Sequence, residues 1–223
     1  MSTCCSGSSV SPTRSGPVRS STSGSRPTTC GRCLRPSDSG SVTVILRAPI
    51  EPLGDGKVVV RLPRDRDVEA LVRFGDDPDV AETIWIPVPT PCPRDVAAAR
   101  LAEFRNGWEQ ENRFGPTLII AGADTDEMIG VVFLRVGEHD SIELTCGVAP
   151  AFRNRDVATA AAVLVSGWCL EELAATRVEL RIGQSNLASQ RVAAKAGFSA
   201  EGIVRSHVAA TGMDYEDLLF VRR

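Results

Sequence analysis

Aromatic side chains and histidines are scarce in this chain of 223 residues. Phe, Trp and Tyr make up 5% of it, with a single tyrosine, Tyr215, and two histidines, His139 and His207. With only two histidines in the chain, we find no Ser-His-Asp or Cys-His pattern and no metal-ligand cluster. Catalysis by such a triad or by a bound metal is therefore not expected.

Long apolar runs are absent as well. No stretch reaches 18 apolar residues, so a membrane-spanning helix is not expected. The N-terminal residues lack the apolar core of a secretory signal, and a net charge of −3 gives no reason to expect nucleic acid as a partner. We therefore expect a cytoplasmic protein that binds neither membrane nor nucleic acid.

Cysteine is present, but not in a metal-binding pattern. Cys30 and Cys33 form one C-x-x-C with no second well-spaced pair, and Cys4 and Cys5 are adjacent, an awkward geometry for two ligands of one ion. Solvated thiols in a polar segment are a better interpretation than a zinc site.

Composition divides the chain near residue 43. Residues 1–43 are rich in Ser, Thr, Gly, Pro and Arg and have almost no large apolar residues, so they cannot bury enough surface to offset their ordering entropy. We predict a disordered tail there, which is an interaction segment, a segment without a role, or not part of the native protein. We also predict a linker over 44–56 and one domain over 57–223.

From Lys57 onward, apolar strands alternate with helical patterns. The periodicity and the turn residues between the segments predict strands over 57–63, 115–123, 127–136, 141–148, 177–182, 198–207 and 215–223, and helices over 65–74, 94–112, about 156–174 and 186–196. This order predicts an α/β protein in which a mixed sheet is flanked by helices.

The turn before the third helix suits an anion. Arg153 and Arg155 lie between a strand and the helix, where free backbone N–H groups and the helix dipole both favour negative charge. However, no glycine lets a phosphate approach closely, and Asp156 lies where the anion would lie. The turn is a phosphate-binding turn, a damaged one, or only the start of a capped helix.

Two segments carry a resemblance to a known family. They are "CGVAPAFRNRDVAT" at 146–159 and "ELRIGQSNLASQRVAAKAGFSAEGIVR" at 179–205, with "EALVRFGDDPDV" at 69–80 in support. The first is similar to the acetyl-CoA motif Arg/Gln-x-x-Gly-x-Gly/Ala, and the second to an Asn-x-x-Ser, Ala-Gly-Phe, Glu-Gly and Arg series. Together they resemble the GNAT-superfamily N-acetyltransferases, in particular the RimJ/RimL-like branch.

The resemblance implies a mostly antiparallel mixed sheet in which the parallel strands 141–148 and 177–182 splay apart around acetyl-CoA. The pyrophosphate would lie on the turn and the helix start, and the thioester carbonyl would face N–H groups near Gly147 and Val148. The coenzyme-binding residues so implied are Gly147, Val148, Arg153, Asn154, Arg155, Asp156, Val157, Ala158, Thr159, Asn186 and Ser189. An amine would attack the thioester directly, because a thioester is already activated.

This sequence departs from the motif at its glycine, which is Asp156 here, and at Asn154, another position that is often glycine. Asn adopts left-handed backbone angles readily, so Asn154 is tolerable. Asp156 is predicted to cap its own helix and to repel a phosphate, which Arg153 and Arg155 would partly offset. We expect coenzyme binding that is weaker but survives.

Catalytic roles are implied for three residues, each with a structural alternative. Asn186 would contact the pantetheine and Ser189 would return a proton to the thiolate, unless both only cap a helix. Glu143 is the candidate general base, acting through water, unless it faces solvent on the sheet. The tyrosine that many family members use for this proton transfer is replaced by Ala193.

The acceptor is expected to be a primary amine, either a protein N-terminus or a small amine. Trp85 and Ile86, in a proline-rich loop, would line its pocket, or would only pack the loop. A homodimer is possible, as in other members of the branch. The alternative function, favoured by Asp156, is a catalytically inactive protein of the same fold that senses coenzyme A or binds a partner.

Overall fold

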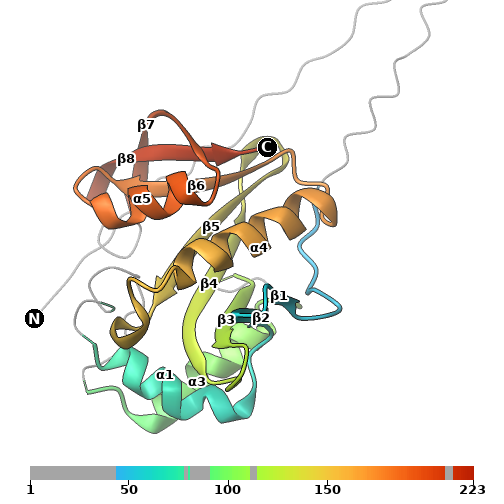
Figure 1. Cartoon of the computed structure of the whole chain (residues 1–223), viewed down its shortest axis with the longest axis vertical. Coiled ribbons are helices and arrows are strands. Elements are labelled where there is room, and N and C mark those ends of the chain that lie inside the picture. Colours follow the sequence, from blue (N-terminus) through green and yellow to red (C-terminus); the bar gives the residue numbers. More distant parts are fainter. Residues whose placement is uncertain (1–43, 78–79, 81–90, 111–114, 209–212) are drawn as a thin grey trace, which may run out of the picture. The chain divides into compact units, whose positions relative to one another are not determined.

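Short apolar strands and amphipathic helices alternate along the chain and build one eight-stranded sheet with helices on both faces (Figure 1). The computed structural model describes residues 44–77, 80, 91–110, 115–208 and 213–223. The chain divides into two units, Met1–Gly40 and Ser41–Arg223, and every described residue belongs to the second unit. The predicted disordered tail lies outside the described residues. Within the described part, no helix is long and apolar enough to cross a membrane.

The strands occur in the sheet in the order β1-β2-β3-β4-β5-β6-β8-β7. Their bounds are β1 Leu53–Gly54, β2 Val58–Arg61, β3 Thr117–Gly122, β4 Met128–Val136, β5 Ser141–Val148, β6 Arg177–Gly183, β7 Ser199–Val208 and β8 Met213–Arg222. Among the described strands, β5 and β6 form the only parallel pair. A helix connects them, because the chain must return to the other end of the sheet before a parallel strand can start. The predicted mixed, mostly antiparallel sheet flanked by helices is confirmed.

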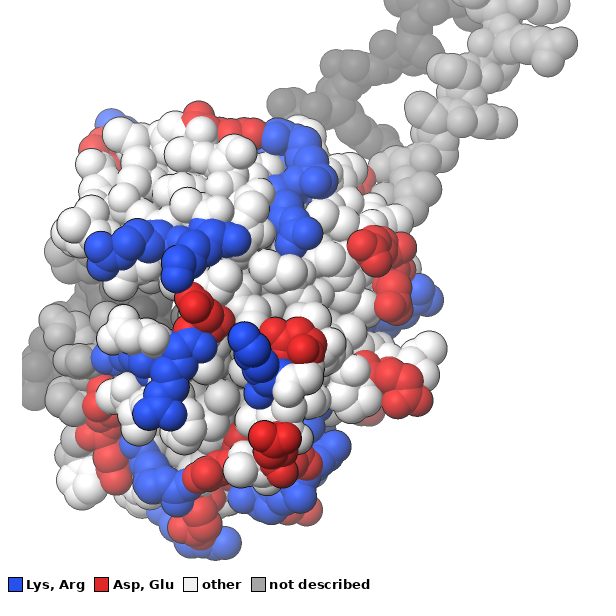
Figure 2. All heavy atoms as spheres, in the orientation of Figure 1, with Lys and Arg blue, Asp and Glu red and all other residues white. Residues whose placement is uncertain are grey.

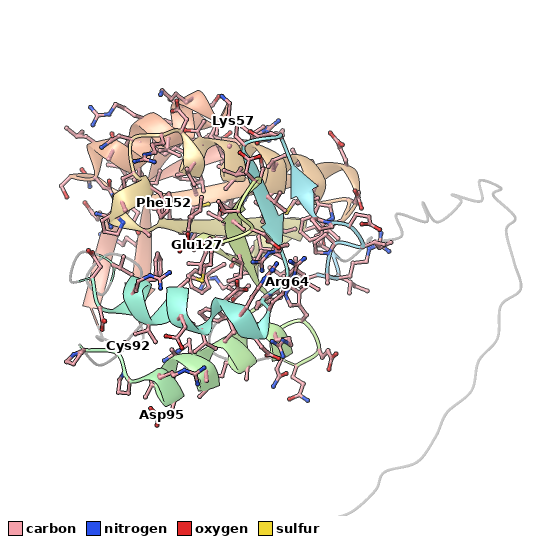
Figure 3. The ribbon with its side chains drawn as sticks, turned by 60° about the horizontal axis from the view of Figure 1, so that its bottom comes forward. Lys57, Arg64, Cys92, Asp95, Glu127 and Phe152 are labelled. Carbon is pink, nitrogen blue, oxygen red and sulfur yellow. The ribbon has the colours of Figure 1, made fainter. Side chains whose placement is uncertain are left out.

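The helices lie on opposite faces of the sheet. They are α1 Val68–Gly75, α3 Arg94–Asn106, α4 Val157–Glu171 and α5 Leu187–Lys195, with 3-10 turns at Asp65–Asp67, Glu138–Asp140 and Pro150–Phe152. Side chains of α4 pack with alternate residues of β2, β5 and β6 into one apolar core, and α1 and α3 pack against β4 and β3 in a second core. Figure 3 shows α1 and α3 side by side, with Cys92 and Asp95 near the start of α3.

The two parallel strands are paired over three residues only. Ser141, Ile142 and Glu143 lie opposite residues 177–179, and no pairing between these strands is found beyond that point in the described structure. Residues 144–148 of β5 remain paired with β4, while 180–183 of β6 remain paired with β8. We call this divergence, between 144–148 and 180–183, the splay; it is the predicted separation of the parallel strands.

Three features differ from the predicted elements. The sequence predicts a linker over 44–56, whereas the structure places Val44 in the core and pairs β1 with β2. The helix predicted over 94–112 ends at Asn106, before Gly107, and the helix predicted to reach about residue 174 ends at Glu171. Glycine and the polar residues that follow it weaken the helical pattern, which is why the end of α3 is hard to locate from periodicity alone.

Candidate functional site

The end of β5 presents backbone groups toward the splay. The N–H of Ala149 donates to the carbonyl oxygen of Ile129 on β4, at 2.9 Å. Because hydrogen-bonding direction alternates along an antiparallel strand, Gly147 also points its backbone groups at β4, whereas Cys146 and Val148 point theirs toward the splay. Of the two residues predicted to offer an N–H to a thioester carbonyl, Val148 is the one oriented to do so.

Two non-glycine residues shape the turn between β5 and α4. Asn154 has φ 59° and Asp156 has φ 58°, so both adopt the left-handed conformation that glycine adopts most easily. The prediction for Asn154 is confirmed in this respect, and Asp156 takes the same conformation at the position of the family's glycine. The turn therefore forms without glycine, although a left-handed conformation costs a residue with a Cβ some free energy.

The predicted capping role of Asp156 is wrong. Its side chain makes no capping hydrogen bond to α4. Instead, Lys195 at the end of α5 donates a hydrogen bond from Nζ to Asp156 Oδ1 at 2.7 Å, and this bond with the lysine's charge lowers the pKa of Asp156 below its usual value. The first hydrogen bond within α4 runs from Ala160 N–H to Asp156 O, so the N–H groups of 157–159 precede the helical ladder.

The two arginines of the turn make local contacts. Arg153 donates from Nε to the carbonyl oxygen of Val148 at 3.1 Å, and its Nη2 lies 3.9 Å from a carboxylate oxygen of Asp77, which follows α1. The Arg155 guanidinium lies over the ring of Phe152, 5.8 Å from its centre. Both positive charges thus lie beside the turn, where they favour an anion.

At the far side of the splay, Asn186 caps α5. Its Oδ1 accepts a hydrogen bond from the N–H of Ser189 at 3.0 Å. This confirms the structural alternative for Asn186, and it leaves the predicted contact with a pantetheine as a proposal. Ser189 is half-buried, in the first turn of α5 after β6 has ended.

Glu143 lies at the base of the splay and is held by two arginines. It is the last residue of β5 paired with β6, and Glu143 Oε2 contacts both Arg135 and Arg181, the latter through Nε at 3.2 Å. The side chain is 16% exposed, so it does not simply face solvent. Nearby, the buried Glu179 accepts a hydrogen bond from Arg177 Nε at 2.7 Å. These five side chains form an ion-pair network across β4, β5 and β6.

The structure describes some of the remaining predicted site residues and not others. Val157 is buried, and Ala158 and Thr159 are half-buried in the first turn of α4, as expected for a helix start beside the turn. Trp85 and Ile86 lie outside the described residues. In the described part of the chain, no group of three or more His, Cys, Asp or Glu side chains could hold a metal ion.

Sequence reasoning did not identify Lys195 or Arg181. Both are ordinary charged residues in regular elements, and each becomes informative only when the fold brings it to a distant carboxylate. In Figure 2, which shows the face that carries α4 and α5, basic side chains gather around these helices with acidic side chains among them.

The sequence of the chain matches a known protein family. Residues 57–199 match the family model described as an acetyltransferase (GNAT) domain. A curated relative, the probable N-acetyltransferase YjcK of Bacillus subtilis, is 32% identical over 123 residues. That match covers 53% of this chain and 65% of the relative, just under two thirds of the relative's length.

Solved structures share the fold at low identity. An acetyltransferase of the GNAT family from Bacillus anthracis has a TM-score of 0.63 and 16% identity, covering 77% of this chain and 98% of that one. RimJ of Mycobacterium smegmatis, solved in complex with CoA-disulfide, has a TM-score of 0.56 and 21% identity, covering 77% and 85%. Such identities show the fold alone.

Proposed function

The chain belongs to the acetyltransferase (GNAT) family, and from that premise we propose that it transfers an acetyl group from acetyl-CoA to a primary amine. The observation that carries the proposal is the splay between β5 and β6. It is followed directly by the turn before α4, where the side chain of Asp156 makes no capping hydrogen bond to the helix. An extended thioester arm and an anionic pyrophosphate need these two features in this order.

The residues present suit the coenzyme. The N–H groups of 157–159 and the dipole of the fifteen-residue α4 favour a pyrophosphate at the helix start, with Arg153 and Arg155 beside it. The backbone groups of Cys146 and Val148 would bind the arm along the edge of β5. The N–H of Val148 would polarise the thioester carbonyl, and acetyl-CoA itself supplies the activated acyl group.

The reaction also needs two proton movements. We propose that Glu143 removes a proton from the acceptor ammonium through water, because it lies several residues from Val148 along β5 and cannot reach the reacting carbon directly. Ser189 would pass a proton to the leaving thiolate and take the proton that the attacking nitrogen loses, and Asn186 would contact the arm while capping α5. Aligning a neutral amine with the carbonyl would supply much of the rate enhancement.

For the acceptor, we propose a protein N-terminus or a small amine. The resemblance of residues 179–205 to the RimJ/RimL-like branch supports the first of these. Trp85 and Ile86 stay candidates for lining the acceptor pocket, and a homodimer stays a prediction.

A specific observation favours a second candidate function, an inactive GNAT-fold protein that senses coenzyme A or binds a partner. Asp156 adds a negative charge beside the start of α4, where the phosphate would bind. If this charge prevents coenzyme A from binding productively, the chain would keep the fold but would not transfer an acetyl group.

The experiment that separates the two is an acetyl-transfer assay that follows release of the free thiol, with peptides of different N-terminal residues and a set of small amines as acceptors. We expect release that depends on both acetyl-CoA and an amine. Ser189→Ala should lower kcat about 10²-fold, as expected for loss of an acid–base group, while Ser185→Ala, an exposed serine of the same connection, should leave kcat unchanged. No amine-dependent release with any acceptor would favour the inactive alternative.

A further inference from the structure

We propose that Lys195 is a positioning residue for coenzyme binding: by holding the Asp156 carboxylate, it cancels a negative charge that would otherwise repel a phosphate at the start of α4. This inference rests on the proposed function. It explains how the chain keeps an anion-binding turn with an aspartate at its centre.

The contact joins two helices that are fixed relative to each other. Lys195 is the last residue of α5 and Asp156 precedes the first residue of α4. The two helices pack together, with Ala161, Ala162 and Ala193 buried in the same core. The pair therefore joins the ends of two helices whose spacing is set by the core.

The direction in which Asp156 points makes this contact possible. A capping aspartate would place its oxygens on the N–H groups of 158 and 159, where a phosphate would bind. In the left-handed conformation, with φ 58°, Asp156 makes no such bond, and its Oδ1 lies 2.7 Å from Lys195 Nζ. The carboxylate is thus directed to a cation and away from the N–H groups that the phosphate needs.

Basic residues other than Lys195 also lie near Asp156 in space or next to it in the chain. Lys57 and Arg155 are exposed, and the charge of Lys57 also lowers the pKa of Asp156, after the larger effect of Lys195. Basic side chains are visible over this face in Figure 2. With Lys195 in place, the Asp156 charge is paired with a cation. Without it, the Asp156 charge acts on the phosphate directly, though water and salt screen it.

A double-mutant cycle tests the inference by calorimetric titration of coenzyme A into the full chain. The variants are Lys195→Met, Asp156→Asn and the double variant; Asn removes the charge and still tolerates the left-handed conformation. We expect Lys195→Met to raise Kd about tenfold in the parent, and less than about twofold when Asn occupies position 156. Arg73→Met, which breaks another exposed ion pair, with Glu127 at 2.8 Å, should leave Kd unchanged.

Each other outcome overturns the inference. An equal loss in both backgrounds would make Lys195 a direct phosphate ligand, and no loss in either would make the contact a plain surface ion pair. Binding by the two variants that carry Asp156→Asn but not by the parent would leave the coenzyme site standing and show that Lys195 does not offset Asp156. No binding by any of the four proteins would remove the proposed function as well. Unfolding midpoints of all variants identify any that fail to fold.

Discussion

At the scale of single residues, Glu143 shows how the fold changes the meaning of a residue. From the sequence it is a carboxylate on a strand that faces either the site or solvent. In the structure it is largely buried and held by Arg135 and Arg181 at the residue where β5 and β6 separate. The same carboxylate therefore anchors the base of the splay and is the proposed proton acceptor.

The substitution Glu143→Gln separates these two roles. If Glu143 relays the proton, kcat should fall about 10²-fold while the Kd for coenzyme A changes little, because the amide retains the shape of the side chain. Glu127→Gln, which removes an exposed ion-paired carboxylate, is the control. Activity within about threefold of the parent would leave Glu143 with a structural role only.

Two thiols with raised pKa values make stability depend on alkaline pH. Burial raises the pKa of Cys169 to about 12, and that of Cys146 to about 12, from an ordinary value of 9.0. Above pH 9 the unfolded chain loses these protons while the folded chain keeps them, so the unfolded state binds fewer protons and the free energy of unfolding falls as pH rises from 9 toward 12.

Urea unfolding of the parent and of Cys169→Ala at about pH 8 and about pH 10 measures this effect. The parent should lose about 1.4 kcal/mol more than the variant between these two pH values, because the variant lacks one of the titrating thiols. Equal losses would show that the Cys169 thiol ionises as readily in the folded protein as in the unfolded chain.

For single residues, conformations and contacts that depend on neighbours along the chain could be predicted, whereas contacts with residues distant in the sequence could not. The left-handed Asn154 and the capping Asn186 follow from residue type and neighbours along the chain. The sequence predicts the wrong hydrogen-bond partner for Asp156, because Lys195 lies 39 positions away. Such a contact depends on how α4 and α5 pack, which residue patterns do not specify.

At the scale of elements, the close approach of β4 and β5 sets the edge of the splay. Gly130 lies opposite Val148, and a Cβ added at Gly130 would collide with the carbonyl oxygen of Gly147 and lie 3.3 Å from Val148 Cα. Gly167 in α4 is the opposite case, since a Cβ there would meet nothing within 4 Å.

Alanine at these two glycines should therefore have effects of opposite sign. Gly130→Ala should destabilise the protein by about 1–3 kcal/mol, because backbone must move, and should weaken coenzyme binding by shifting β5. Gly167→Ala should stabilise it by about 0.5–1 kcal/mol through helix propensity. Urea unfolding measures both, and a neutral Gly130→Ala would mean that β5 is not held at this distance from β4.

The order and type of the elements from 57 onward could be predicted, since each strand or helix has its own periodicity. The predicted strand over 141–148 agrees with β5 to the residue. The short β1 was missed because two residues give no pattern, and the position of β8 between β6 and β7 was not predicted because strand order depends on pairing between distant segments. The splay itself came from the family resemblance, not from the spacing of residues.

At the scale of the whole molecule, two apolar cores hold the sheet between its helices. One core includes Val44, which is 4% exposed and whose N–H donates to Asp140 Oδ1 at 3.1 Å. At the end of β2, buried Arg61 forms two hydrogen bonds of 2.8 Å with buried Asp67, which also accepts a hydrogen bond from the backbone N–H of Arg64 at 2.8 Å. The domain of this fold thus starts before Lys57.

Two truncations test where the domain starts. Removing residues 1–43 should leave the free energy of unfolding unchanged, because the described core begins at Val44. Removing residues 1–56 should lower it by about 2 kcal/mol or more, through loss of the buried Val44 side chain and of β1. Thermal and urea unfolding give both values. Equal stability of the two truncated chains would make 44–56 the linker that the sequence predicts.

The central claim is that the splay and the start of α4 together bind acetyl-CoA. Hydrogen–deuterium exchange of the full chain, with and without saturating acetyl-CoA, tests it most directly. We predict slower exchange at the amides of 144–148 and 157–159 when the coenzyme is present, and no change over α1 and α3. Protection elsewhere, or unchanged exchange at both of these segments, would contradict the claim.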